Sequence, residues 1–196
     1  MNILQGSTLL LALSLSAPAF AQTISTPTYM LLKPLVQNDA NGADICGVEG
    51  TAAVVINKNL ETYEFKFYVS ASTLSGHIDA GRLAESGTKK ALPRPSGFWI
   101  ARKDNTGEAL HARDLTASRK PGHIAGTADL IPASKQLWNL IGGEEMQISI
   151  EYPNQRSQNI IQFSQQLAGE DHDALLACMK EQMVSIRREY EAQKKK

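Results

Sequence analysis

The segment TYEFKFYV, residues 62–69, has the clearest strand pattern in this chain. Its side chains alternate between apolar and polar, so an extended backbone places the two sets on opposite faces. The apolar set is Tyr63, Phe65, Phe67 and Val69. A period of two residues is typical of a strand that covers a hydrophobic core on one side and meets water on the other. The segment therefore predicts a β-sheet with one solvated face.

Other short runs of strand composition recur along the chain, with turn residues between them. The expected strands are residues 29–36, 51–57, 62–69, 97–103, 108–114, 123–131, 145–152 and 159–164. Pro34 places the first of these strands at a sheet edge or a bulge, because proline has no N–H to donate to the ladder. The pattern predicts a mainly β fold, an antiparallel β-sandwich or half-open barrel of about seven or eight strands.

The hydrophobic period changes near the C-terminus. Apolar residues there recur every three or four positions, which marks one face of an α-helix. They are Leu175, Met179, Met183, Ile186 and Tyr190. We predict a C-terminal helix over 170–193 that docks onto the sheet and gives an α+β domain, followed by a basic tail over 194–196. The alternative is a helix that projects from the domain and meets a partner. A shorter helix is expected over 134–141, before a pair of glycines.

The first 21 residues contain no charged side chain. They hold an apolar run, Leu9–Leu15, and end in Ala-Phe-Ala, the small-x-small pattern of a signal peptidase site. We predict a cleaved signal peptide over 1–21 and a single domain over 22–193, periplasmic or secreted. A buried N-terminal helix or a membrane anchor is the alternative. The apolar run is shorter than the roughly 20 residues that a span requires, so no stable membrane span is expected after cleavage.

Two cysteines, Cys46 and Cys178, stand near opposite ends of the predicted domain. An even number of cysteines in an exported chain favours a disulfide bond, and two buried free thiols are the alternative. No Cys-x-x-Cys spacing is present, so the pair has no signature of a redox enzyme. We predict that the bond ties the C-terminal helix to the start of the sheet.

Residues 71–97 lack a long periodic run and are rich in glycine, serine and proline. Long connections of this kind are often functional, so we interpret the segment as a candidate binding loop, with a solvated loop as the alternative. The candidate residues are His77, Arg82, Lys89, Lys90, Arg94 and, just beyond the loop, Trp99. Its four cations outnumber its two carboxylates, which favours an anionic partner.

The sequence contains no recognisable catalytic or cofactor motif. Its four histidines include no pair with the i, i+4 spacing of a zinc site, and no phosphate-binding glycine loop occurs. The Gly-x-Ser-x-Gly elbow of α/β-hydrolases is also missing. The formal net charge is +0, without the broad basic surface of a nucleic-acid binder. We expect no catalytic residue, no metal, no cofactor and no nucleic-acid partner.

The C-terminal region has an apolar strand, a turn, and a strand ending in Phe163-x-x-x-Leu167-x-Gly169, before a helix that carries Cys178. This order resembles the C-terminal arrangement of small exported β-domains, including accessory and virulence-associated proteins of Gram-negative envelopes. The resemblance assigns no functional residue. The expected function is a non-enzymatic binding or accessory protein of the bacterial cell envelope, whose partner is a protein or an anionic envelope component. The alternative is a small periplasmic hydrolase whose residues converge only in the fold.

Overall fold

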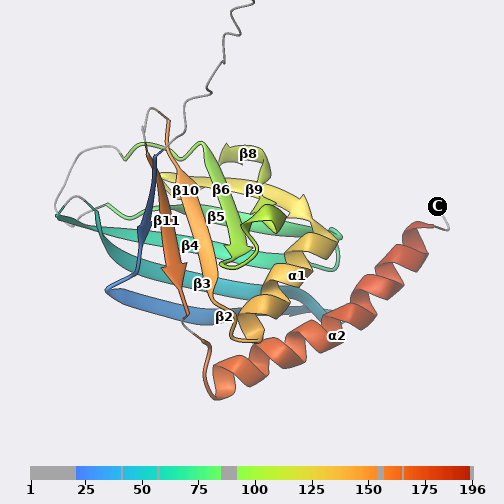
Figure 1. The fold of residues 1–196 in the computed structure, drawn as a ribbon. Coiled ribbons are helices and arrows are strands. Elements are labelled where there is room, and N and C mark those ends of the chain that lie inside the picture. Colours follow the sequence, from blue (N-terminus) through green and yellow to red (C-terminus); the bar gives the residue numbers. More distant parts are fainter. Residues whose placement is uncertain are drawn as a thin grey trace, which may run out of the picture.

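Two β-sheets pack face to face with their strands crossing at a steep angle, and two helices lie beside them (Figure 1). A computed structural model describes residues 21–40, 42–56, 58–84, 92–153, 157–164 and 166–194. The predicted mainly β, α+β sandwich is confirmed. The predicted signal peptide lies outside the described residues, apart from Ala21 at the start of the first strand.

Each sheet mixes strands from distant parts of the chain. The five-stranded sheet has the order β1 (Ala21–Ser25), β11 (Ser157–Phe163), β10 (Met146–Glu151), β6 (Gly97–Arg102) and β7 (Leu110–His111). The six-stranded sheet has the order β2 (Tyr29–Asp39), β3 (Gly42–Ile56), β4 (Asn59–Ser70), β5 (Ser75–Arg82), β9 (His123–Asp129) and β8 (Arg113–Ala117). Paired strands are antiparallel except β1 and β11, which run parallel.

The core lies between the two sheets and contains the apolar set predicted from residues 62–69. Phe65 of β4 is 1% exposed, and its ring centroid lies 6.3 Å from that of Phe163 on β11. Glu64 and Lys66 point to the opposite face of the same strand, away from the five-stranded sheet. The six-stranded sheet therefore keeps a polar outer face.

The interpretation of residues 71–97 as an irregular loop is wrong for residues 75–82, which form β5 in the middle of the six-stranded sheet. Its glycines resemble those of a loop, but they permit close packing. A Cβ atom at Gly76 would lie 2.5 Å from the Cβ of Ala133 on helix α1 (Leu130–Ile141). Ile78 and Ala80 supply the buried face of the strand.

The expected strand over 108–114 divides between the two sheets. Leu110 and His111 form β7, which pairs with β6 as the predicted hairpin requires. The chain then crosses to the six-stranded sheet, where β8 pairs with β9. This division, together with β1 and β5, brings the strands to eleven in the described part of the chain. Pro34 lies on the edge strand β2, as predicted, and that strand has a bulge between Gln37 and Asn38.

Helix α1 begins four residues before the predicted start at Ser134. Pro132 falls in its first turn, where backbone N–H groups have no intrahelical acceptor. The missing N–H of proline therefore costs the helix no hydrogen bond. The helix packs on β4, β5, β6 and β9. The chain turns after it at Gly143, whose φ of 77° suits a residue without a side chain.

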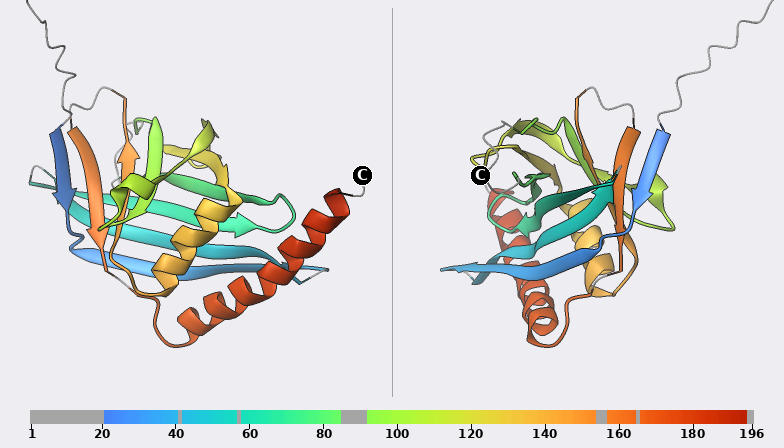
Figure 2. Two further views of the ribbon diagram at one scale, coloured as in Figure 1. Left: turned by 45° about the vertical axis from the view of Figure 1, so that its right-hand side comes forward. Right: turned by 90° about the vertical axis from the view of Figure 1, so that its left-hand side faces the viewer.

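Helix α2 spans Glu170–Gln193, as predicted, and packs mainly on β3 and β2. The disulfide between Cys46 and Cys178 is confirmed, with Cα atoms 5.7 Å apart. Leu175 and Met179 are buried, but Met183 is 61% exposed and the last turns extend past the sheets (Figure 2). Docking is therefore confirmed for the first half of the apolar stripe only. Neither described helix meets the length and apolarity that crossing a membrane demands.

Candidate functional site

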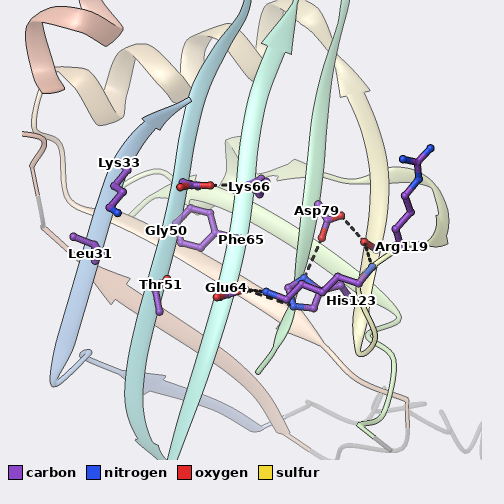
Figure 3. A pocket seen from close by; sticks show the side chains of 13 residues that line it. Leu31, Lys33, Gly50, Thr51, Glu64, Phe65, Lys66, Asp79, Arg119 and His123 are labelled. Carbon is purple, nitrogen blue, oxygen red and sulfur yellow. Dashed lines mark hydrogen bonds and ion pairs between the residues drawn. The ribbon is translucent and has the colours of Figure 1, made fainter. Parts of the chain in front are cut away.

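A cavity of about 400 Å³ lies on the outer face of the six-stranded sheet (Figure 3). Outward-facing side chains of β2, β3, β4, β5 and β9 form its base, and the turn from Ser118 to Lys120 borders it. The cavity runs across the strands, because its lining residues come from five neighbouring strands of the sheet. The far side of this sheet faces the hydrophobic core.

Two rows of side chains cross the strands in this cavity. In the first row, the register places neighbours of alternating charge side by side. They are Lys33, Glu49, Lys66 and Asp79. Lys66 Nζ lies 3.6 Å from Glu49 Oε2, so one cation and one anion of this row are already paired. The second row consists of Leu31, Thr51, Glu64, Gly81 and His123.

Gly81 gives the second row its shape. A Cβ atom at this position would lie 2.6 Å from Cγ of His123 and 2.3 Å from the carbonyl oxygen of Gly122. Because Gly81 has no side chain, the imidazole of His123 lies over it and its Nε2 comes to 4.0 Å from Oε2 of Glu64. His123 is only 3% exposed. The missing side chain thus creates the place that the ring occupies.

Asp79 holds the imidazole in place. Its Oδ1 lies 3.0 Å from Nδ1 of His123, and its Oδ2 accepts a hydrogen bond of 2.5 Å from the hydroxyl of Ser118. Burial raises the pKa of Asp79, but the hydrogen bonds from His123 and Ser118 outweigh it, so the pKa lies below the ordinary value of 3.8. Asp79 is therefore an ionised acceptor at neutral pH, and His123 Nδ1 donates to it.

The other nitrogen of His123 has no partner. Nε2 is buried and makes no hydrogen bond within the described residues. In the neutral imidazole that has its proton on Nδ1, Nε2 carries a lone pair and is an acceptor. A buried acceptor without a hydrogen-bond partner is rare in a folded protein.

Glu64 is engaged on its other side by Lys120, with which it forms an ion pair. Burial of the Lys120 ammonium lowers its pKa, although Glu49 acts in the opposite direction. This pair fixes the turn between β8 and β9 over the sheet. The carboxylates of the cavity are therefore matched by internal partners.

Two cations of the cavity remain without such partners. Lys33 on β2 and Arg119 in the turn before β9 are exposed, and the side chain of neither forms an ion pair or hydrogen bond with another described residue. Figure 3 shows them at opposite sides of the cavity. Four cations and three carboxylates line the cavity, so it carries an excess of positive charge.

A serine, an aspartate and a histidine thus lie within hydrogen-bond reach, but their order does not suit nucleophilic catalysis. In a catalytic triad the imidazole stands between the hydroxyl and the carboxylate and removes the hydroxyl proton. Here Asp79 stands between Ser118 and His123. His123 Nε2, which would act as the base in a triad, lies beside Glu64 and not beside the hydroxyl of Ser118.

A second histidine contacts hydroxyl groups elsewhere on the same face. His77 Nε2 lies 2.9 Å from the hydroxyls of Thr73 and Ser75, and its ring stacks on Tyr68 with centroids 5.0 Å apart. Burial lowers the pKa of His77. None of these four residues lines a described cavity.

The candidate residues of the sequence do not form one site. Arg82 Nη1 lies 3.1 Å from Glu61 at the end of β5, and Arg94 is exposed outside the cavity. Trp99 is 6% exposed in a small apolar cluster of the other sheet. Lys89 and Lys90 lie outside the described residues. No group of three potential metal ligands occurs in the described ranges.

No family model matches this chain, and neither the curated proteins nor the solved structures include one that is significantly similar to it.

Proposed function

We propose that this protein is an exported, non-enzymatic binding protein of the bacterial cell envelope that holds an anionic ligand in the cavity of the six-stranded sheet. The observation that carries the proposal is the placement of Lys33 and Arg119. Neither cation is paired with another residue in the part of the chain that the structure describes, and they flank one cavity from opposite sides. A role as an accessory to secretion or virulence would fit such a binding protein.

Two features support export. The disulfide between Cys46 and Cys178 suits an oxidising compartment, because cytosolic thiols are kept reduced. The N-terminal segment has the composition and the cleavage pattern of a signal peptide. Together they favour the periplasm or the cell exterior as the location of the protein.

Local charge supports an anionic ligand. The whole chain has a formal net charge of +0, so a polyanion has no general reason to approach it. Within the cavity, Glu49, Glu64 and Asp79 are engaged by internal partners. Asp79 keeps its charge beside the imidazole, so the cavity has a net excess of one positive charge. Lys33 and Arg119 are the cations that can contact a ligand without breaking an ion pair between described residues.

The test is binding of fluorescein-labelled dextran sulfate, measured by fluorescence anisotropy at low salt, with uncharged dextran as the reference. The double variant Lys33→Glu/Arg119→Glu should bind about tenfold or more weakly, since each charge contact changes from attractive to repulsive. Added salt should weaken binding by the unmodified protein, because exposed charges are screened.

The matched control is Lys180→Glu/Arg94→Glu, which changes the net charge equally at two exposed residues outside the cavity. Its affinity should stay close to that of the unmodified protein. Equal weakening by both variants would show that only overall charge matters and would overturn the proposal. Failure of the unmodified protein to bind dextran sulfate would overturn it as well.

A small hydrolase is the second candidate, because Ser118, Asp79 and His123 meet in one cavity. The order of these groups argues against it. We expect no hydrolysis of p-nitrophenyl acetate above background and no difference between the unmodified protein and Ser118→Ala. Turnover that Ser118→Ala abolishes would favour the hydrolase.

A further inference from the structure

Resting on the proposed function, we infer that the ligand is an extended peptide segment with two acidic side chains, lying across the strands from β2 to β9. One carboxylate contacts Lys33 and the other contacts Arg119. A backbone N–H between them donates to Nε2 of His123. The inference names a class of partner, a protein with an exposed acidic segment.

The spacing between β2, which carries Lys33, and β9, which follows the turn that carries Arg119, sets the length of the segment. In the six-stranded sheet, β2 and β9 are separated by four steps between neighbouring strands. At about 4.8 Å per step this is roughly 19 Å, and an extended peptide rises about 3.3 Å per residue. Two acidic residues about six positions apart therefore match Lys33 and Arg119. A small anion such as phosphate is too short to contact both.

The middle of the cavity favours a segment that is uncharged between its two acids. Lys66 and Lys120 are already paired with Glu49 and Glu64, so they offer no free charge to a third acid. A carboxylate near Asp79 would meet an ionised side chain of like charge. Small polar residues fit this stretch of the ligand best.

The buried acceptor of His123 points to a peptide. Nε2 is enclosed and has no hydrogen-bond partner among the residues that the structure describes, while every peptide unit other than proline supplies one N–H donor. An acidic saccharide also has donors, but the described lining offers no exposed aromatic face on which a sugar ring could stack, because Phe65, its one aromatic residue besides His123, is 1% exposed. Leu31 is 38% exposed at the β2 end and offers contact to an apolar side chain instead.

The experiment uses a series of capped peptides with two aspartates separated by one, three, five, seven or nine glycine and serine residues. Affinity for the full-length exported protein is measured by fluorescence anisotropy. We expect the tightest binding near five intervening residues. That peptide should bind at least threefold more tightly than the peptide with one intervening residue, and at least threefold more tightly than a peptide with a single aspartate. In the variants Lys33→Ala and Arg119→Ala, the dependence on spacing should disappear.

The role of His123 is tested by His123→Asn. The asparagine amide can still donate to Asp79 but removes the acceptor at the position of Nε2. Peptide affinity should fall about threefold or more, while dextran sulfate affinity stays unchanged. The same contact can be tested on the unmodified protein with the peptide that binds most tightly. Its central backbone nitrogens are methylated one at a time, and methylation of the nitrogen that donates to His123 should weaken binding. If no position does, the contact to His123 is wrong.

The outcomes separate this inference from the proposed function. If dextran sulfate binds through Lys33 and Arg119 but the peptides show no optimum of spacing, the peptide inference fails and the anion-binding function stands. If neither probe binds, both fail. If oligogalacturonate binds more tightly than every peptide, the ligand is an acidic saccharide and the inference is overturned.

Discussion

The imidazole of His123 lies 3.0 Å from the carboxylate of Asp79, although 44 residues separate the two in the chain. The contact joins β9 to its neighbour β5 on the outer face of the sheet. Ser118 adds a second donor to the same carboxylate. One aspartate therefore holds both the imidazole and the turn that border the cavity.

Replacement of Asp79 by asparagine should lower stability in a pH-dependent way. The pKa of Asp79 is below 3.8 in the folded protein, so its contribution is present above the unfolded pKa and is lost as the pH falls through the folded value. At pH 7 we expect the free energy of unfolding of Asp79→Asn to be about 1–3 kcal/mol lower than that of the unmodified protein. Urea titrations should show the difference shrinking below about pH 4. Glu144→Gln, at an exposed carboxylate, should show no such change.

Loss of the disulfide should destabilise the protein substantially. Cys46 and Cys178 close a loop with a sequence separation of 132, which restricts the unfolded chain. Cys46→Ala/Cys178→Ala should lower the free energy of unfolding by about 2–5 kcal/mol, measured in urea. The intact mass of the unmodified protein should be about two daltons below the dithiol value, because oxidation removes two hydrogens. A mass equal to the dithiol value contradicts the bond.

Gly81→Ala should weaken both the fold and the site. The added methyl group would meet backbone and ring atoms at 2.3 and 2.6 Å, so either the strand or the imidazole must move. We expect a loss of about 1–3 kcal/mol in thermal or urea unfolding, and weaker binding of the peptide with two aspartates, whose backbone N–H contacts the imidazole. Gly107→Ala is the matched control, because the nearest atom to its Cβ would lie 3.9 Å away. Equal effects of the two substitutions would contradict the close packing at Gly81.

Gln182 should be essential for docking α2. Its Nε2 donates to the carbonyl oxygens of Asp44 and Val69, at 2.5 and 2.9 Å, in a fully buried position. Gln182→Leu would remove both hydrogen bonds from the interface between α2 and the sheet, and should lower the free energy of unfolding by about 2–4 kcal/mol. The neighbouring substitution Met183→Ala, at an exposed side chain, should change stability by less than about 0.5 kcal/mol. A small effect at Gln182 would mean that water replaces its hydrogen bonds.

The elements with a strong period could be predicted from the sequence, and the site could not. The alternation over 62–69 and the helical stripe after Gly169 identify β4 and α2, because burial of one face imposes each period. Strand β5 escapes prediction because glycines needed for packing resemble those of a loop. The cavity depends on sheet register, which brings Lys33 and Asp79 into one row and is not encoded locally.

One signal of the site is present in the sequence. The tripeptide Gly-His-Ile occurs at residues 76–78 and again at residues 122–124. The structure places the two copies on the adjacent strands β5 and β9, each with its isoleucine in the core. The first histidine stacks on Tyr68 and the second occupies the cavity. Only the pairing of the strands distinguishes these two environments.

The parallel pairing of β1 with β11 has a consequence for how the protein is made. Strand β1, the first described strand, pairs with β11, which ends at Phe163. The five-stranded sheet therefore stays incomplete until most of the chain has been synthesised. Contacts between residues so far apart form slowly, because a large loop must close first. A nascent polypeptide of this design remains unfolded for longer than one built from local contacts. That delay would suit a polypeptide that must be threaded through a narrow channel before it folds.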